Sequence, residues 1–176
     1  MSSLIIGNIC SLLAMCSDGI SASRKTAKGI LSVQIASQFL YGASTIVLKG
    51  YSGAVQNAVS VFRNLTAMSK KQYKWIEWLL LSLAVGLGIY FNNRGLVGWL
   101  PVLGNFIYTL TVFRFKDQER PIKYAFAIST VMFAIFNFSI QNYVAFGGNV
   151  VVFIMAVIFL IKGRSKNGKN ERNTAV

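Results

Sequence analysis

The sequence predicts an all-α membrane protein in which seven transmembrane helices form two parallel three-helix repeats joined by one linking helix. Two properties of the composition predict the membrane location: the 176 residues are 54% hydrophobic, and their mean hydropathy is +0.53. Both values lie outside the range typical of soluble globular domains. The spacing of the basic residues, a third observation, predicts how the helices are ordered across the membrane.

Seven apolar segments are separated by short polar gaps, and each is close to the roughly 20 residues that cross a bilayer as a helix. They cover residues 4–21, 29–48, 50–68, 75–91, 96–115, 122–141 and 143–162. Only the polar stretch 163–176 extends beyond the last of them. Any binding or chemistry is therefore expected within the membrane or at its two faces.

The net charge of +13 would by itself be compatible with nucleic-acid binding. Its distribution favours a membrane instead, because only Lys49 and Arg94 of the 18 basic residues fall in gaps on one side. Basic residues concentrate in cytoplasmic loops, so the N-terminus is predicted outside and the C-terminus in the cytoplasm. No nucleic-acid partner is expected, whereas the lipid bilayer and its anionic headgroups are expected partners.

An odd number of helices allows two three-helix units of the same orientation only if one extra crossing separates them. The helix expected at 75–91 supplies this crossing, which gives a 3+1+3 arrangement of parallel repeats. The predicted divisions are a first repeat at 1–68, a linker at 69–95, a second repeat at 96–162 and a basic cytoplasmic tail at 163–176.

A short motif occurs once in each expected repeat, with its two copies 92 residues apart, the distance from Tyr51 to Tyr143. In both copies an asparagine, Asn57 or Asn149, follows the tyrosine at the same spacing. A polar amide inside a membrane is costly to keep without a use, so two at a similar depth indicate a paired site. We predict that the pair binds a small polar solute such as a sugar, nucleoside or carboxylate. Hydrogen bonding to neighbouring helices is the alternative.

Further polar side chains follow helical spacing along one face of the expected helices 29–48 and 122–141. Gln38 and Thr45 lie on the first helix, and Thr130 and Asn137 occupy the equivalent positions on the second. They are predicted to line the same cavity, although interhelical hydrogen bonds explain them about as well. Weaker candidates of the same kind are Asn8, Ser11, Asn105 and Tyr108.

Arg63 is the one basic residue well inside an expected helix. It lies near the cytoplasmic end of the segment 50–68, where a long side chain can snorkel to the headgroups. Snorkelling is the favoured interpretation, and anchoring of an anionic substrate is the other. Asp18 and Glu77 lie near helix ends and are expected at the interface. With no carboxylate deep in any expected helix, a facilitator fits better than a proton-coupled pump.

Enzyme activity finds little support in the residues. The chain has no histidine and five acidic residues, and it lacks a glycine-rich phosphate-binding loop. Cys10 and Cys16 are too few for a metal site and are expected to be small packing residues. No enzyme activity, cofactor or metal is therefore expected.

The chain resembles the YgjV-type bacterial inner membrane proteins over about residues 4–163, in the strings 53–58 (GAVQNA) followed by Arg63, 100–104 (LPVLG) and 113–114 (FR). The resemblance implies a multi-pass protein of the bacterial inner membrane, related to the SWEET sugar transporters, PnuC-type vitamin transporters and mitochondrial pyruvate carriers. In the SWEET group an asparagine on the third helix of each repeat contacts the substrate, which implies that role for Asn57 and Asn149. That group also has a proline hinge in both repeats, whereas only Pro101 lies within an expected helix here.

The favoured hypothesis is a facilitative transporter of a small polar solute. The alternative is a non-transporting membrane scaffold that interacts with lipids or with a protein partner. The sequence leaves open whether the chain forms a homo-oligomer.

Overall fold

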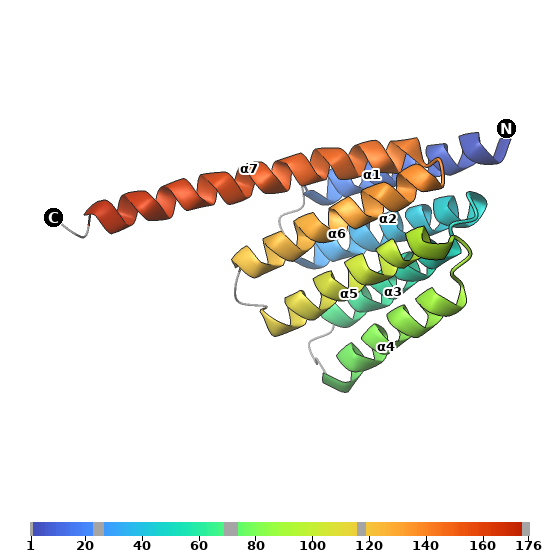
Figure 1. Ribbon diagram of the computed structural model, residues 1–176, viewed down its shortest axis with the longest axis horizontal. Helices are drawn as coiled ribbons and strands as arrows, with labels where there is room; N and C mark the ends of the chain where they lie inside the picture. The colour runs from blue at the N-terminus through green and yellow to red at the C-terminus, as the bar shows by residue number, and fades with distance from the viewer. Residues whose placement is uncertain (1, 23–26, 69–73, 116–118, 174–176) are drawn as a thin grey trace.

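The computed structural model describes residues 2–22, 27–68, 74–115 and 119–173, and these residues form a bundle of α-helices (Figure 1). One short 3₁₀ helix, η1, precedes the fifth α-helix. The elements are α1 (Ser2–Ala22), α2 (Ala27–Val47), α3 (Tyr51–Met68), α4 (Lys74–Tyr90), η1 (Gly95–Gly98), α5 (Trp99–Arg114), α6 (Glu119–Ser139) and α7 (Tyr143–Asn173).

The seven expected helices are confirmed as helices, with shifts of one to three residues at most ends and two differences that have a specific cause. The segment expected to begin at residue 96 starts as η1 and becomes α-helical at Trp99, so that Pro101 lies in the first turn, where its missing N–H costs nothing. The last helix continues to Asn173 instead of ending at residue 162. No proline interrupts residues 163–173, so no residue there prevents the helix of the apolar segment from continuing. Within the described ranges, no helix is both long enough and apolar enough to cross a membrane.

The helices pack as two groups of three with α4 at one side. In the first group α2 packs between α1 and α3, and in the second α6 packs between α5 and α7. The groups meet where α1 packs against α7 and where α3 packs against α5. The helix α4 packs on both α3 and α5, and α7 projects well beyond the other helices (Figure 1).

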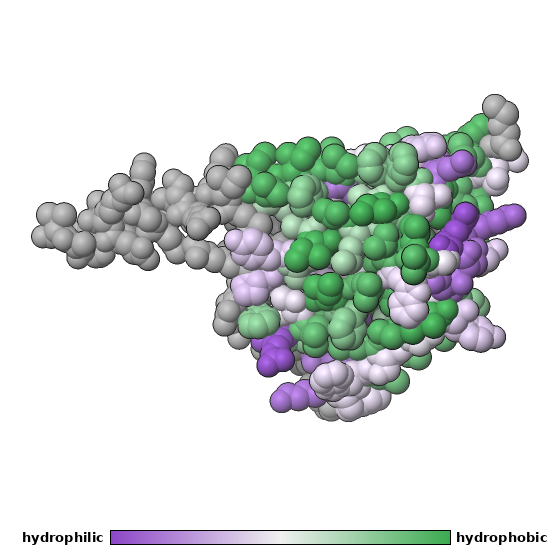
Figure 2. Space-filling model, in the orientation of Figure 1, coloured by the Kyte–Doolittle hydropathy of each residue, from purple (hydrophilic) through white to green (hydrophobic). Residues whose placement is uncertain are grey.

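Apolar side chains cover the outside of this bundle. Figure 2 shows hydrophobic residues over the middle of one face, with hydrophilic residues gathered toward its ends. The exposed residues include many large apolar ones, such as Phe39, Phe62, Trp78 and Ile135. A surface of this kind is matched to an apolar surrounding.

Two tight turns with the same backbone geometry join α2 to α3 and α6 to α7. In each turn one residue has a left-handed backbone conformation, with φ of +56° at Lys49 and +61° at Gln141. These two residues are also separated by 92 positions. The backbone hydrogen bonds of the first turn recur at that offset in the second; the bond that closes the first turn, from the Gly50 amide to the Thr45 carbonyl, is 2.7 Å long, and its counterpart is 2.9 Å long.

Phe136 is fully buried where the two groups of helices meet. Its ring lies against Gly50 and Gly53 of the α2–α3 turn and of α3, and it shares a small core with Leu48 and Ile140. A side chain at Gly53 would overlap this ring. The absence of a side chain at Gly53 therefore sets how closely α3 can approach α6.

Replacing Gly53 by alanine should lower the free energy of unfolding by about 1–3 kcal/mol, the usual cost of forcing an extra methyl group into a packed contact. The matched control is Gly86→Ala on α4, where an added Cβ meets nothing within 4 Å. Thermal unfolding of both variants in detergent tests the contact. Equal melting temperatures for the two variants would contradict the packing of α3 on Phe136.

Candidate functional site

The helix α3 has polar side chains on two faces that point to different neighbours. On one face Gln56 and Arg63 reach α4 and α5. On the other, Asn57 and Asn64 are two turns apart and therefore lie one above the other. The asparagine face also contains Gly53, which packs on Phe136 of α6. It is directed toward α2 and α6, between the two groups of helices.

Asn57 is 9% exposed and lies beside α2. Its Cβ would be 3.7 Å from a Cβ placed at Gly42. Gly42 is close in helical angle to Gln38 and Thr45, so the structure brings Asn57 next to the predicted polar face of α2. Asn149, its counterpart on α7, is half-buried. The helices α3 and α7 are not among the pairs that pack extensively, and no described contact joins the two asparagines.

The two predicted threonines satisfy their hydroxyl groups within their own helices. Thr45 Oγ1 donates to the carbonyls of Tyr41 and Gly42, both at 2.9 Å. Thr130 Oγ1 donates to the carbonyl of Phe126 at 2.8 Å. Both residues are buried, and each hydroxyl oxygen keeps the capacity to accept a hydrogen bond.

The predicted amides differ from the threonines, because none has a side-chain hydrogen bond within the part of the chain that the structure describes. These are Asn57, Asn137, Asn149 and the half-buried Gln38. Asn137 is only 7% exposed. Ser52 Oγ is the one described buried side-chain atom that is enclosed and lacks a partner. The unpaired amide atoms of Asn57 and Asn137 therefore retain accessible surface rather than being sealed in the core.

Arg63 is directed into the bundle, which differs from the snorkelling favoured by its position in the sequence. Its Nη1 donates to Asn105 Oδ1 at 3.2 Å and to Thr109 Oγ1 at 3.3 Å, both on α5. The guanidinium carbon also lies 5.4 Å from the centre of the Tyr108 ring, within cation–π range. The close packing of α3 on α5 explains the difference, since it offers acceptors nearer than the headgroups.

A chain of hydrogen bonds extends from Arg63 to α4. Asn105 Nδ2 donates to Gln56 Oε1 at 2.8 Å, and Gln56 Nε2 donates to the carbonyl of Ala84 at 2.8 Å. Gln56 is fully buried and Asn105 nearly so. Gly88 leaves room for this contact, because a side chain there would meet Gln56 Nε2 and Val102. The chain joins α3, α4 and α5 through polar groups.

Gln56 was missed by sequence reasoning, although a signal was present. Its spacing from Arg63 places both residues on one face of α3. The internal repeat marks the adjacent Asn57, because Asn149 lies 92 positions later, whereas the position equivalent to Gln56 is Gly148. Asn105 and Tyr108 were weaker candidates, and the structure places both beside Arg63.

A second polar cluster ties α1 and α2 to the α6–α7 turn. Asn8 Nδ2 donates to the carbonyl of Gln141 at 3.0 Å, and Asn8 Oδ1 accepts from the amide of Val144 at 3.0 Å. Asn142 Nδ2 donates to Ser44 Oγ at 3.0 Å, and Asn142 Oδ1 caps α7. We call these contacts the Asn142 latch.

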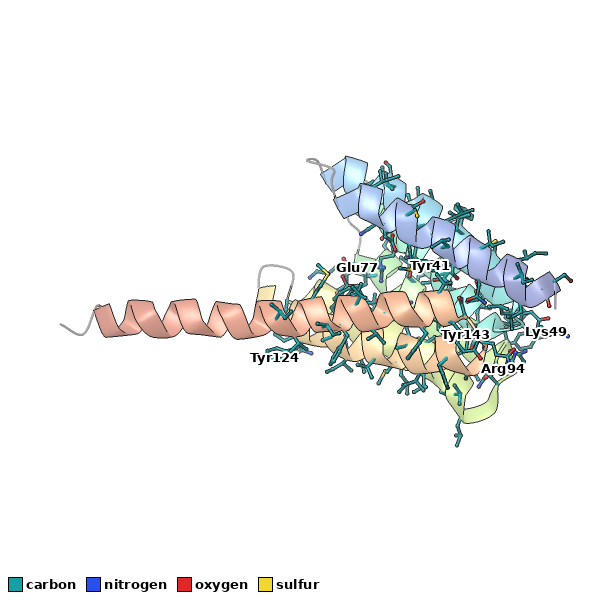
Figure 3. The ribbon with its side chains drawn as sticks, turned by 90° about the horizontal axis from the view of Figure 1, so that it is seen from above. Tyr41, Lys49, Glu77, Arg94, Tyr124 and Tyr143 are labelled. Carbon is teal, nitrogen blue, oxygen red and sulfur yellow. The ribbon has the colours of Figure 1, made fainter. Side chains whose placement is uncertain are left out.

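The latch lies at the end of the bundle where Lys49, Arg94 and Tyr143 gather; Tyr124 lies toward the opposite end (Figure 3). In this view the ribbons of α1 and α2 are close to those of α6 and α7 at the Lys49 end and diverge toward the other. Arg94 further secures the Lys49 end by donating to the carbonyls of Leu48 and Lys49 at 2.9 and 3.1 Å.

Asp18 is less exposed than its place near a helix end suggests. The carboxylate accepts a hydrogen bond of 2.5 Å from Ser37 Oγ on α2, and the residue is half-buried. This pair joins α1 to α2. Among the described residues, no group of three or more histidine, cysteine, aspartate or glutamate side chains could hold a metal ion.

Several residues of the predicted topology lie outside the described residues. They include Arg24, Lys25, Lys70, Lys71 and Lys116, which belong to the basic gaps.

Substituting Asn105 by leucine should lower the free energy of unfolding by about 1–3 kcal/mol, because Gln56 Oε1 and Arg63 would lose their partner in a buried place. Thr111→Val is the matched control on α5, since the one described bond of that hydroxyl goes to the carbonyl of Ile107 in its own helix. Thermal unfolding in detergent measures both. A loss in the control as large as in the leucine variant would contradict the role given to Asn105.

Comparison with known proteins gives a match to a family model. The model of Imp-YgjV, described as a bacterial inner membrane protein, matches residues 5–167. No curated protein matches the chain, and no solved structure matches it.

Proposed function

The chain belongs to the Imp-YgjV family of bacterial inner membrane proteins, and from this premise we propose that it is a facilitative transporter of a small polar solute. The solute passes between the two three-helix groups, which are parallel repeats in a 3+1+3 order like that of the SWEET group. The N-terminus is outside and the C-terminus is in the cytoplasm. The transporter is not an enzyme and needs no cofactor.

The observation that carries this proposal is the state of the predicted amides. Asn57 and Asn137 are more than nine-tenths buried, and their side-chain amides have no described hydrogen bond and retain accessible surface. In a membrane protein an amide without a protein partner is unfavourable unless water or a solute reaches it. A polar solute between the groups supplies the missing donors and acceptors.

The matched turns support the repeat arrangement. The two turns have a left-handed residue at the same position and the same backbone hydrogen bonds. Two units with one fold are expected to share these features. The contact of α1 with α7 is also the counterpart of the contact of α5 with α3 under exchange of the two units. An exchange of this kind is what an axis between parallel repeats produces.

The Asn142 latch supports alternating access. The described hydrogen bonds between α1–α2 and the α6–α7 turn all lie at the Lys49 end. The two helix pairs diverge toward the opposite end (Figure 3). The charge pattern assigns the Lys49 end to the outside, so this conformation corresponds to a transporter closed on its outer side.

Substituting Asn57 or Asn149 by alanine should lower solute uptake about fivefold, the effect of losing one neutral hydrogen bond of about 1 kcal/mol. The measurement is uptake by liposomes containing the purified protein, with glucose, uridine and pyruvate as the solutes. The control is Ser82→Ala, an exposed residue of α4.

If a solute is taken up equally by the wild type and by both asparagine variants, Asn57 and Asn149 do not contribute to the binding site. If protein-containing and empty liposomes take up all three solutes equally, the non-transporting scaffold becomes the better hypothesis.

A further inference from the structure

Arg63 is a cation whose described partners are all neutral. They are an amide oxygen, a hydroxyl oxygen and an aromatic ring, contributed by Asn105, Thr109 and Tyr108 of α5. No described carboxylate lies within ion-pair distance of the guanidinium. An arginine inside a helix bundle is normally balanced by an anion, because its charge is costly to leave uncompensated.

The hydrogen bonds of Arg63 leave one edge of the guanidinium unused. A guanidinium has five N–H donors, and both described bonds come from Nη1. Nε and Nη2 have no described partner. Their N–H groups lie side by side along one edge, which is the geometry that holds two oxygen atoms of one carboxylate or phosphate.

The free edge is held in place and is not sealed. Asn105 is oriented by Gln56, which is itself bonded to α4, so the acceptor for Nη1 is fixed from three helices. The Tyr108 ring is in turn packed against Phe126 of α6, with ring centres 5.6 Å apart. Nε and Nη2 are absent from the enclosed, unpaired atoms, so they retain accessible surface. A fixed cation whose unpaired fork is not fully enclosed is arranged to receive an anion.

We propose that Arg63 binds an oxyanion, a carboxylate or a phosphate group, through its Nε–Nη2 edge at the contact of α3 with α5. The inference rests on the proposed transport function, because it makes the transported solute an anion. Gln56 and Asn105 are positioning residues for the guanidinium. A phospholipid headgroup presents the same chemistry, and the test separates the two sources.

Chemical modification of the wild-type protein provides the direct test. Purified protein in phosphatidylcholine vesicles is treated with the arginine reagent phenylglyoxal under two conditions. One sample contains inorganic phosphate, and the other contains chloride at the same ionic strength. Mass spectrometry of the peptides then measures modification of Arg63. The expected result is modification in chloride and at least about tenfold slower modification in saturating phosphate. Arg114, exposed at the end of α5, serves as the internal control and should react equally in both.

Two outcomes would overturn the inference without any variant. An Arg63 that does not react in chloride would show that its edge is inaccessible. An Arg63 that reacts equally in phosphate and in chloride would show that free phosphate does not bind there, which overturns the assignment to a solute.

Variants then test the residue and its geometry. Arg63→Gln should abolish the rise in melting temperature that phosphate gives the wild type, since binding of a ligand to the folded state is what raises it. Arg114→Gln removes the same charge near the same end of the bundle and should keep the rise. Arg63→Lys keeps the charge without the fork and should weaken phosphate binding about tenfold or more. A rise of wild-type size in Arg63→Gln would contradict the proposal, and wild-type affinity in Arg63→Lys would contradict the two-point contact.

Vesicles that also contain phosphatidylglycerol distinguish the two sources. If this lipid alone protects Arg63 and added phosphate does not, the oxyanion is a headgroup and the assignment to a solute is overturned. Uptake distinguishes the two proposals from each other. If phosphate protects Arg63 but neither pyruvate nor phosphate is taken up, the anion site is supported and transport of these anions is rejected. If uptake is unchanged in Arg63→Gln, the anion site does not lie on the transport path.

Discussion

In a helix bundle surrounded by apolar material, a polar side chain can find hydrogen bonds only on its own helix or on a neighbouring one. The contacts of α3 follow from this constraint. Gln56 reaches a backbone carbonyl of α4 and the amide of Asn105, and Arg63 reaches Asn105 and Thr109. These bonds fix α4 and α5 against α3, and they leave the neighbouring face of α3, with Asn57, directed toward α2 and α6. The position of the candidate site is thus a consequence of which polar groups the surrounding helices satisfy.

The two proposed repeats share their turns and differ in their third helices. The turns at Lys49 and Gln141 have the same hydrogen bonds. Beyond the first residue of α3, Tyr51, which matches Tyr143, only Asn57 has a polar equivalent at the matching position of α7. The positions that match Gln56 and Arg63 are Gly148 and Met155. The helix that joins the groups, α4, packs on the polar third helix, and the apolar one packs on α1. The two groups therefore share the backbone geometry of their turns, but their third helices differ: within the described residues, α3 packs on the linking helix α4, and α7 does not.

Hydrophobic length and periodicity predicted the seven helices, and most predicted ends lie within a few residues of the observed ones. These signals are local, and the packing of the bundle does not override them. The end of α7 was missed, because hydropathy marks where an apolar segment stops and not where helical hydrogen bonding stops.

The direction of Arg63 could not be predicted either, since it depends on acceptors supplied by Asn105 and Thr109, more than 40 positions away. For Asn57, Asn149, Gln38, Thr45, Thr130 and Asn137, the sequence indicated which residues share a helical face. Whether an amide finds a partner is decided by a neighbouring helix, which a single sequence does not specify.

The Asn142 latch has a mechanical consequence. A helix of about 21 residues is about 31 Å long, and α1 and α2 are bonded to the α6–α7 turn near only one of their ends. In the proposed transport cycle, a tilt of this pair together with α3, which packs on α2, would have its fulcrum at the latch. A tilt of about 10° at the fulcrum would displace the far tip by about 5 Å, which is about one helical pitch. Rearranging a few hydrogen bonds around Asn8 and Asn142 would then be amplified into a movement large enough to change which side chains face each other at the opposite end.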